Sequence, residues 1–307
     1  MRKNTLFVLF ILPFLMVNAQ NQPFNLYEGA IPNAKQAENL QVSNPRAPGR
    51  GWTEKISIPT LMRFDPVDNL KNGTTVVICP GGGYAGVADE HEGTLVAKEL
   101  NKWGITAFVL RYRMPTERTM IDPSVGPLQD AQQALRYVRT NAHKFGLNPN
   151  RIGIMGFSAG GHLAATATTH FKMKADSSVM DTTSVRPDFS VLVYPVISMK
   201  EDITHSGSRN NLLGTNPSFK KVISFSNEEQ ITTHTPPVFL VHAADDKAVP
   251  VENSIQFYQN CVKKGVPAEM HLYPKGGHGF GMVNPTTKAT WMDSLSLWLD
   301  SLGFMKK

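Results

Sequence analysis

The chain has 307 residues, of which 41% are hydrophobic, so it can bury a large core as one or two domains. Its 31 Lys and Arg outnumber 25 Asp and Glu and give a formal charge of +6. The basic residues are scattered, with only short pairs such as Lys220-Lys221. That pattern is typical of a solvated surface and shows no nucleic-acid-binding footprint. We interpret the two cysteines, Cys79 and Cys261, as buried unpaired thiols.

Residues 1–19 are predicted to be a signal peptide. Arg2 and Lys3 form a basic start, residues 6–17 are an apolar run, and Val17-Asn18-Ala19 supplies small residues for cleavage before Gln20. The run is too short for a spanning helix, so an uncleaved membrane anchor is the less favoured alternative. We therefore expect an exported protein, periplasmic or extracellular, without stable membrane insertion.

After an Asn-, Pro- and Gly-rich arm over residues 20–50, predicted strands and helices alternate. The strands are predicted at 54–58, 74–79, 106–110, 151–155, 189–194, 238–243 and 269–272. The helices are predicted at 93–103, 128–142, from 163 onward, 252–263 and 290–302. Such alternation predicts one α/β domain over 51–307, with a mostly parallel central sheet covered by helices on both faces. Ligands bind such sheets at the carboxyl ends of the strands.

The stretch 197–236 breaks this alternation, because it is polar and contains only short helical pieces. A connection of that length inside a compact domain is usually functional or mobile. Since it lies between two predicted strands, we expect a partial cap over the site.

The segment Gly156-Phe157-Ser158-Ala159-Gly160 fits the pattern G-x-S-x-G. It follows a predicted strand and precedes a predicted helix, which is the placement that a nucleophile elbow requires. Glycines at 156 and 160 avoid collisions with the strained turn, and the helix N-terminus favours developing negative charge. Ser158 is therefore the candidate nucleophile; a glycine-rich turn without chemistry is the alternative.

A serine nucleophile needs a base, and His278 is the candidate among nine histidines. It lies in the glycine-rich stretch GGHGFG just after the strand at 269–272, so the loop can return the imidazole over the sheet edge. His162 is expected to pack under the elbow. A solvent-exposed loop histidine is the alternative for His278.

The acid that orients the histidine should lie between serine and histidine in this fold. Strand 238–243 ends directly in Asp245-Asp246, and we choose Asp246 because acid-x-x-Val-Pro places it in the loop just beyond the strand. Asp245 is the second choice; otherwise it braces the turn.

The turn CPGGGY at 79–84 follows the first buried strand and suits an oxyanion loop. The amides of Gly82, Gly83 and Ala159 are the candidate oxyanion donors, and Tyr84 is expected to bind substrate in the pocket. A phosphate-binding loop is disfavoured, because no Lys-Ser/Thr pair follows.

Three other groups receive ordinary interpretations. His91-Glu92 lacks partners for a metal site and is expected to cap a helix. The Arg111–Arg113 stretch and Asp130 are expected to form surface or interhelix ion pairs. Trp52 could stack on a sugar, but packing the arm is the commoner role.

The sequence resembles the α/β-hydrolase esterases in which H-G-G-G precedes G-x-S-A-G-G, related to the hormone-sensitive-lipase type. It is most similar to the bacterial branch that resembles acetyl xylan and feruloyl esterases. The matching stretches span about residues 55–285: VVICPGGGYAGVADEHEG, AFVLRYR, PLQDAQQALRYVR, RIGIMGFSAGGHLA, TPPVFLVHAADDKAVPVENS and LYPKGGHGF. The resemblance implies a Ser158-Asp246-His278 triad, with Gly82, Gly83 and Ala159 around the oxyanion. Pro80 stands where the wider family has His, so we expect a differently stiffened loop.

These features together predict a two-step serine ester hydrolase that needs no metal or organic cofactor. Export and the resemblance point to acetyl esters on plant xylan or its oligomers, a carbohydrate esterase activity in xylan degradation. A feruloyl esterase or a general small-acyl esterase is the alternative. A peptidase is less favoured, because no additional large domain is present. A non-catalytic binding protein is disfavoured, because the triad and the oxyanion loop are all present.

Overall fold

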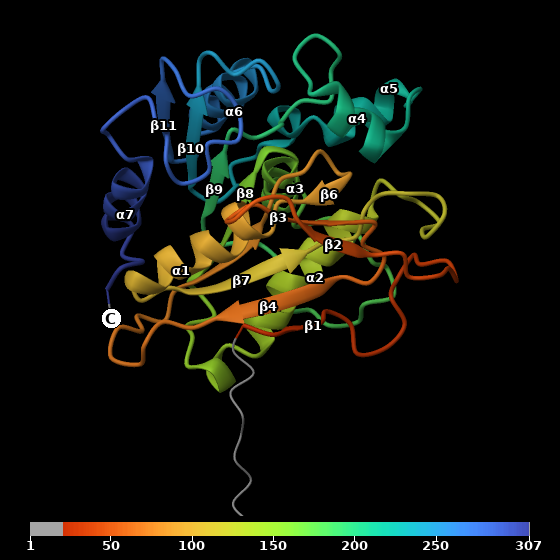
Figure 1. The fold of residues 1–307 in the computed structure, drawn as a ribbon, viewed down its shortest axis with the longest axis horizontal. Coiled ribbons are helices and arrows are strands. Elements are labelled where there is room, and N and C mark those ends of the chain that lie inside the picture. Colours follow the sequence, from red (N-terminus) through yellow and green to blue (C-terminus); the bar gives the residue numbers. More distant parts are fainter. Residues whose placement is uncertain (1–20, 307) are drawn as a thin grey trace, which may run out of the picture.

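The computed structural model describes residues 21–306, and the predicted signal peptide lies outside these residues. An eight-stranded sheet forms the centre of the molecule (Figure 1). Its strands, in spatial order, are β1 (Pro23–Asn25), β4 (Thr60–Phe64), β7 (Thr106–Arg111), β5 (Thr75–Cys79), β8 (Ile152–Phe157), β9 (Ser190–Val193), β10 (Val238–Ala243) and β11 (Ala268–Tyr273). From β7 to β11 all neighbours are parallel, whereas β4 and β1 join the β7 edge antiparallel. The predicted mostly parallel sheet is confirmed.

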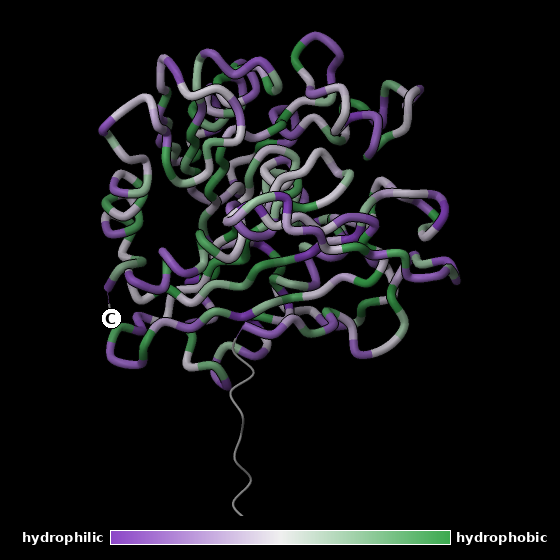
Figure 2. The backbone as a smooth tube through the Cα atoms, viewed as in Figure 1, coloured by the Kyte–Doolittle hydropathy of each residue, from purple (hydrophilic) through white to green (hydrophobic). Residues whose placement is uncertain are grey.

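Helices cover both faces of this sheet. One core contains residues of α2 (Gly126–Thr140), α3 (Ser158–Thr169) and α6 (Glu252–Lys263). The other contains residues of α1 (Leu95–Lys102) and α7 (Trp291–Ser301). The strands β5, β8 and β10 are buried at every position, which is why they read as continuous apolar runs. Figure 2 shows hydrophobic residues along the central strands and hydrophilic residues toward the periphery.

The stretch at 197–236 contains α4 (Ser206–Leu213), α5 (Phe219–Phe225) and the 3₁₀ turn η3 (Asn227–Gln230). The two helices lie at the top right of Figure 1. Apolar residues of both helices belong to the same core as α3. The ring of His162 on α3 and that of His170, directly after it, reach the carbonyls of Phe225 and Ser224 at 2.9 Å each. The segment is therefore fastened to the helix that begins at Ser158.

A small second sheet connects the N-terminal arm to the oxyanion loop. It consists of β2 (Val42–Pro45), β3 (Gly51–Glu54) and β6 (Gly86–Val87), paired antiparallel. The arm also supplies β1, which the sequence did not predict. The predicted strand at 54–58 is wrong: Lys55 has a positive φ of 56°, which ends β3 before β4 begins at Thr60.

Two smaller predictions have clear outcomes. Cys79 and Cys261 are buried free thiols, which confirms their interpretation. Arg113 and Asp130 form an ion pair of 2.8 Å in which both side chains are almost inaccessible, at 1% and 0% exposure. The expectation of a surface or interhelix pair is therefore wrong, because the pair is buried and Arg113 lies on no helix. The pair joins the segment directly after β7 to α2, and Tyr27 and Pro32 of the arm hydrogen-bond to it. Within residues 21–306, no helix has the length and apolar character needed to cross a bilayer.

Candidate active site

Ser158 lies at the turn where β8 becomes α3, with a left-handed φ of 52°. The neighbouring backbone leaves no room for side chains on either side of it. A Cβ at Gly156 would lie 2.1 Å from the carbonyl oxygen of Gly160, and one at Gly160 would lie 2.1 Å from that of Cys79. The two glycines are therefore a steric requirement of the turn. In the sheet register Cys79 pairs with Gly156, so the oxyanion loop and the elbow start side by side.

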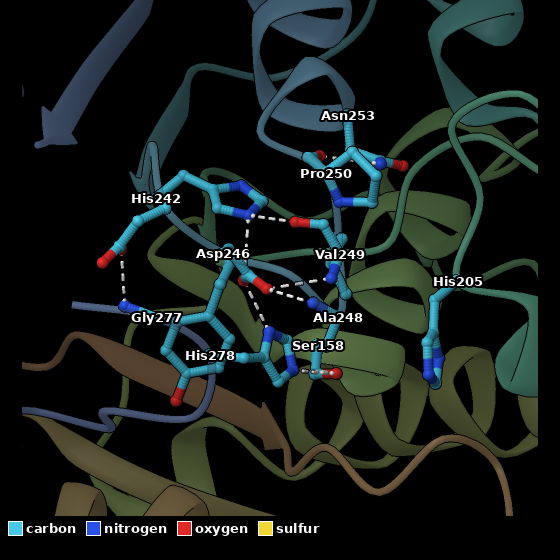
Figure 3. Close-up of polar contacts among 12 residues, drawn as sticks. Ser158, His205, His242, Asp246, Ala248, Val249, Pro250, Asn253, Gly277 and His278 are labelled. Carbon is cyan, nitrogen blue, oxygen red and sulfur yellow. Dashed lines mark hydrogen bonds and ion pairs between the residues drawn. The ribbon is translucent and has the colours of Figure 1, made fainter. Parts of the chain in front are cut away.

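The structure brings Ser158, His278 and Asp246 into one hydrogen-bonded chain (Figure 3). His278 Nε2 lies 2.8 Å from Ser158 Oγ, and His278 Nδ1 lies 2.6 Å from Asp246 Oδ2. Because a carboxylate only accepts, Nδ1 carries the ring proton and Nε2 is free to accept from the serine hydroxyl. This is the geometry of a serine nucleophile with an oriented base.

Asp246 is held as an ionised acceptor. Its Oδ1 accepts the amides of Ala248 and Val249, each at 2.9 Å, and its Oδ2 also lies 3.3 Å from His242 Nε2. Burial acts to raise its pKa, but the hydrogen bonds from His242, His278 and Val249 outweigh burial and hold the pKa of Asp246 well below its usual range. Asp246 is therefore a charged acceptor for the proton on His278 Nδ1.

Asp245, the second choice for the acid, does not contact His278. Its Oδ1 accepts the amide of Gly277 at 2.7 Å and so holds the loop that carries the histidine. The loop is also fixed by Tyr194, whose ring lies edge-on at 5.0 Å from the His278 ring and whose hydroxyl accepts the Gly281 amide at 2.9 Å.

The predicted oxyanion loop runs beside the elbow. Gly82 has φ 145° and Gly83 has φ 63°, and a Cβ at Gly82 would lie 2.1 Å from the Gly86 carbonyl oxygen. Gly82, Gly83 and Ser158 line one cavity. The amides of Gly82, Gly83 and Ala159 hydrogen-bond to no acceptor within residues 21–306. Three free donors near a nucleophile can bind a developing oxyanion.

Tyr84, predicted to bind substrate, lines a neighbouring cavity of about 310 Å³ together with Ile56 and Asn211. Its side chain is buried, with 2% exposed, and does not line the cavity that contains Ser158. Its hydroxyl lies 2.8 Å from His162 Nδ1, and its ring packs against Tyr112. Tyr84 therefore supports the oxyanion loop from the core. His162, which was expected to pack, is fully buried and also contacts the Phe225 carbonyl.

The cavity of about 390 Å³ has walls outside the predicted triad and oxyanion loop. They come from the β2–β3 hairpin and the capping segment: Arg46, Arg50, Trp52 and His205. Figure 3 shows His205 on the opposite side of Ser158 from His278. Among them the sequence points to Trp52 alone, as a residue that could stack on a sugar, because the tertiary packing of two irregular segments places the other three.

Contacts within the protein fix the orientation of Trp52 and the tautomer of His205. The Arg46 guanidinium stacks 3.8 Å from the centre of the Trp52 ring, so one ring face already packs against the hairpin. His205 Nδ1 accepts the Ser208 amide at 3.3 Å, so its neutral ring carries the proton on Nε2. Burial and the nearby His278 lower the pKa of His205, which favours that neutral form.

The expectation that His91 and Glu92 cap a helix is wrong. No side chain caps η1 (Glu90–Thr94), the π-helical turn that contains them. Glu92 instead accepts the Gly81 amide at 2.7 Å, and His91 Nε2 lies 3.3 Å from the Gly279 carbonyl. Within residues 21–306, no cluster of three or more His, Cys, Asp or Glu is arranged to hold a metal ion.

Residues 64–261, well over half of the chain, match the BD-FAE family. The chain belongs to this family. The predicted α/β-hydrolase fold and the resemblance to its esterases are confirmed. A crystal structure of an acetyl ester-xyloside bifunctional hydrolase from Caldicellulosiruptor lactoaceticus is 37% identical, with a TM-score of 0.76 over 94% of this BD-FAE chain and 99% of that one.

Two curated relatives of this BD-FAE chain are longer proteins, of which only a part matches. An acetylxylan esterase of Xylanibacter ruminicola is 38% identical over 243 residues, which are 75% of this chain and 46% of that protein. An endo-1,4-β-xylanase B of Butyrivibrio fibrisolvens is 38% identical over 236 residues, 76% of this chain and 36% of that protein. The chain thus spans less than half the length of both.

The lowered pKa of Asp246 predicts a pH-dependent contribution to stability. Because the folded carboxylate has a lower pKa than the unfolded one, its stabilising effect is complete above the usual value of about 4 and is lost as pH falls below it. Asp246→Asn should therefore reduce the free energy of unfolding more at pH 5 than at pH 3. Urea titrations of both proteins at the two pH values test this; a gap that widens on acidification would contradict it.

Proposed function

We propose that this BD-FAE protein is a serine carboxylic ester hydrolase that acts through Ser158, His278 and Asp246. The observation that supports it best is the continuous chain from Ser158 Oγ through His278 to Asp246, at 2.8 and 2.6 Å, beside free amides in the same cavity. The family match and the esterases among the relatives agree with this chemistry.

In the first step, Ser158 Oγ attacks the carbonyl carbon of the ester while His278 Nε2 takes its proton. The carbonyl π electrons move onto oxygen, and the amides of Gly82, Gly83 and Ala159 stabilise that oxyanion. Asp246 stabilises the imidazolium. The tetrahedral intermediate then collapses: the bond to the alcohol oxygen breaks, and that oxygen leaves with the proton from His278.

In the second step, water replaces the alcohol. His278 removes a proton from the water as its oxygen attacks the acyl carbon, and a second oxyanion forms at the same amides. Collapse breaks the bond to Ser158 Oγ, which recovers its proton from His278, and releases the carboxylic acid. Every step uses protein groups and water alone.

The proposed substrates are acetylated xylan or its oligomers. Polar and aromatic residues of the hairpin and the cap line the cavity (Arg46, Arg50, Trp52 and His205), which suits a hydroxyl-rich sugar better than a long alkyl chain. The relatives include an acetylxylan esterase and an acetyl ester-xyloside hydrolase. A feruloyl or general small-acyl esterase is the second candidate, because a cavity of about 390 Å³ has room for acyl groups larger than acetyl.

Export through the signal peptide at 1–19 belongs to the same proposal, since polymeric xylan is found outside cells. The proposed mature protein has the arm from residue 20, the catalytic domain from residue 51 and the partial cap at 197–236. The cap and the arm both supply walls of the cavity.

Ser158→Ala should lower kcat for p-nitrophenyl acetate by at least about 10³-fold, because the nucleophile that forms the acyl-enzyme is lost. Ser178→Ala is the matched control, since that serine is exposed and bonds only to its neighbour Asp176. Both variants should keep the wild-type circular dichroism spectrum. Near-normal turnover by folded Ser158→Ala protein would refute the assignment.

The adjacent aspartates offer a test of which one orients the base. Asp246→Asn should reduce kcat by roughly 10³–10⁴-fold, because an amide cannot hold the required His278 tautomer as an anion does. Asp245→Asn keeps the contact between Asp246 and His278, so its loss should stay below about tenfold. The same p-nitrophenyl acetate assay measures both, and equal losses in the two variants would show that the assignment is wrong.

A substrate panel tests the proposed specificity. Acetate release from acetylated xylan, ferulate release from methyl ferulate, and hydrolysis of p-nitrophenyl esters of increasing chain length should be compared on the mature chain. We expect the highest kcat/KM for acetyl esters on xylose units and a decline with acyl length. Activity confined to long acyl chains would contradict the carbohydrate substrate.

A further inference from the structure

Four consecutive side chains after the oxyanion loop each contact a different segment around the site. Asp89 accepts from Arg111 on β7 at 2.6 Å, and Glu90 accepts the Gly51 amide of the hairpin at 2.7 Å. His91 contacts Gly279 in the loop that carries His278 (the histidine loop), and Glu92 contacts the oxyanion loop. The last three belong to the π-helical turn η1, a geometry that is rare and occurs often at functional sites.

Among Glu90, His91 and Glu92, the last is the most buried, with 4% of its surface exposed, although it lines the cavity. One carboxylate oxygen accepts the Gly81 amide at 2.7 Å, and the other accepts the Tyr194 hydroxyl at 2.8 Å. A buried carboxylate needs such donors, since an unpaired charge there would be costly. Both oxygens therefore have a donor.

Through Tyr194, Glu92 also joins the two loops on which the chemistry depends. The Tyr194 hydroxyl donates to Glu92 and accepts the Gly281 amide of the histidine loop at 2.9 Å. The Tyr194 ring contacts the His278 ring edge-on. One carboxylate thus connects the oxyanion loop with the loop that holds the base.

The oxyanion loop is fixed at almost every polar backbone atom. Four carbonyls accept hydrogen bonds: Pro80 from Tyr112 at 2.8 Å, Gly81 from Ala88 at 2.8 Å, Gly82 from Ala85 at 3.0 Å, and Gly83 from Asn211 at 2.8 Å. The Gly81 amide donates to Glu92. Among the described residues, the Gly82 and Gly83 amides have no acceptor. The bonds of the loop therefore leave free the two donors proposed for the oxyanion.

Steric contact makes the position of Glu92 matter for Ser158. A Cβ at Gly81 would lie 2.6 Å from Glu92 Oε2 and 2.9 Å from Ser158 Cβ, so Gly81 is pressed between the carboxylate and the nucleophile. The peptide that Glu92 orients is Pro80–Gly81, which directly precedes the peptide that carries the Gly82 amide. A shift of Gly81 would move the free amides relative to the oxygen that they must reach.

We propose that Glu92 is a positioning residue that sets the geometry of the oxyanion hole through the Gly81 amide. This inference rests on the proposed esterase function. Glu92 acts in this role as a fixed acceptor of the Gly81 amide and the Tyr194 hydroxyl. The loop begins with Pro80, for which the sequence predicts a differently stiffened loop. The contacts of Tyr112 and Glu92 with Pro80 and Gly81 are what hold it.

The test compares Glu92→Ala and Glu92→Gln in the full chain with Glu228→Gln as matched control. Glu228 is an equally buried glutamate, 2% exposed, that bonds Ser198 in the capping segment and does not line the cavity. Its replacement reports loss of stability without a change at the loop. Circular dichroism and thermal unfolding identify the folded variants, which are then assayed with p-nitrophenyl acetate.

The inhibition constant of a trifluoromethyl ketone is the measurement that a purely structural role of Glu92 would leave unchanged. Ser158 Oγ adds to the carbonyl carbon of the ketone, the serine proton passes to His278, and the resulting oxyanion occupies the hole. We expect Glu92→Ala to lower kcat about 10²-fold and to weaken the inhibition constant in parallel, with KM changed less than about threefold, as for loss of one oxyanion donor. Glu92→Gln should lose about tenfold, because its amide oxygen can still accept from Gly81 without the charge.

Glu228→Gln should retain wild-type kcat and inhibition. A folded Glu92→Ala protein with wild-type kcat and inhibition constant would overturn the proposal, as would an equal loss in Glu228→Gln. Failure of the esterase function itself looks different: the wild-type chain would then hydrolyse no ester, whatever residue stands at 92.

Discussion

Ser158 occupies the left-handed region of backbone space because β8 turns into α3 at that residue. A non-glycine residue there costs about 1–3 kcal/mol, so the surroundings must hold it in place. They do so by close backbone packing: the carbonyls of Gly160 and Cys79 fill the space where side chains at 156 and 160 would go. The oxyanion loop, which begins at the end of β5, is thereby pressed against the elbow.

The polar groups around this turn are arranged to stabilise charge. Asp246 is stabilised as an anion by two amides and two imidazoles, so its charge is fixed before any substrate binds. Glu92 accepts hydrogen bonds from the Gly81 amide and the Tyr194 phenol. This second buried carboxylate near the proposed oxyanion therefore has a donor for each oxygen. Preorganised donors and acceptors of this kind need no rearrangement during reaction.

Sequence patterns predict much of this arrangement because parallel strands end at one edge of a sheet. Ser158, Asp246 and His278 follow β8, β10 and β11, so a correct assignment of strands brings them together, and 238–243 and 252–263 were predicted at their observed bounds. The direction of the Tyr84 side chain and the contacts of Glu92 depend on packing between distant segments. The same holds for the walls formed by the hairpin and the cap, which have no periodicity to read.

Covalent labelling of the nucleophile tests the central claim most directly. A fluorophosphonate reacts with an activated serine, which displaces fluoride and becomes phosphonylated, and peptide mass spectrometry locates the adduct. The account predicts one adduct on Ser158 in the wild-type chain, and labelling slowed by orders of magnitude in His278→Ala. An adduct on another serine, or none on a folded chain, would contradict it.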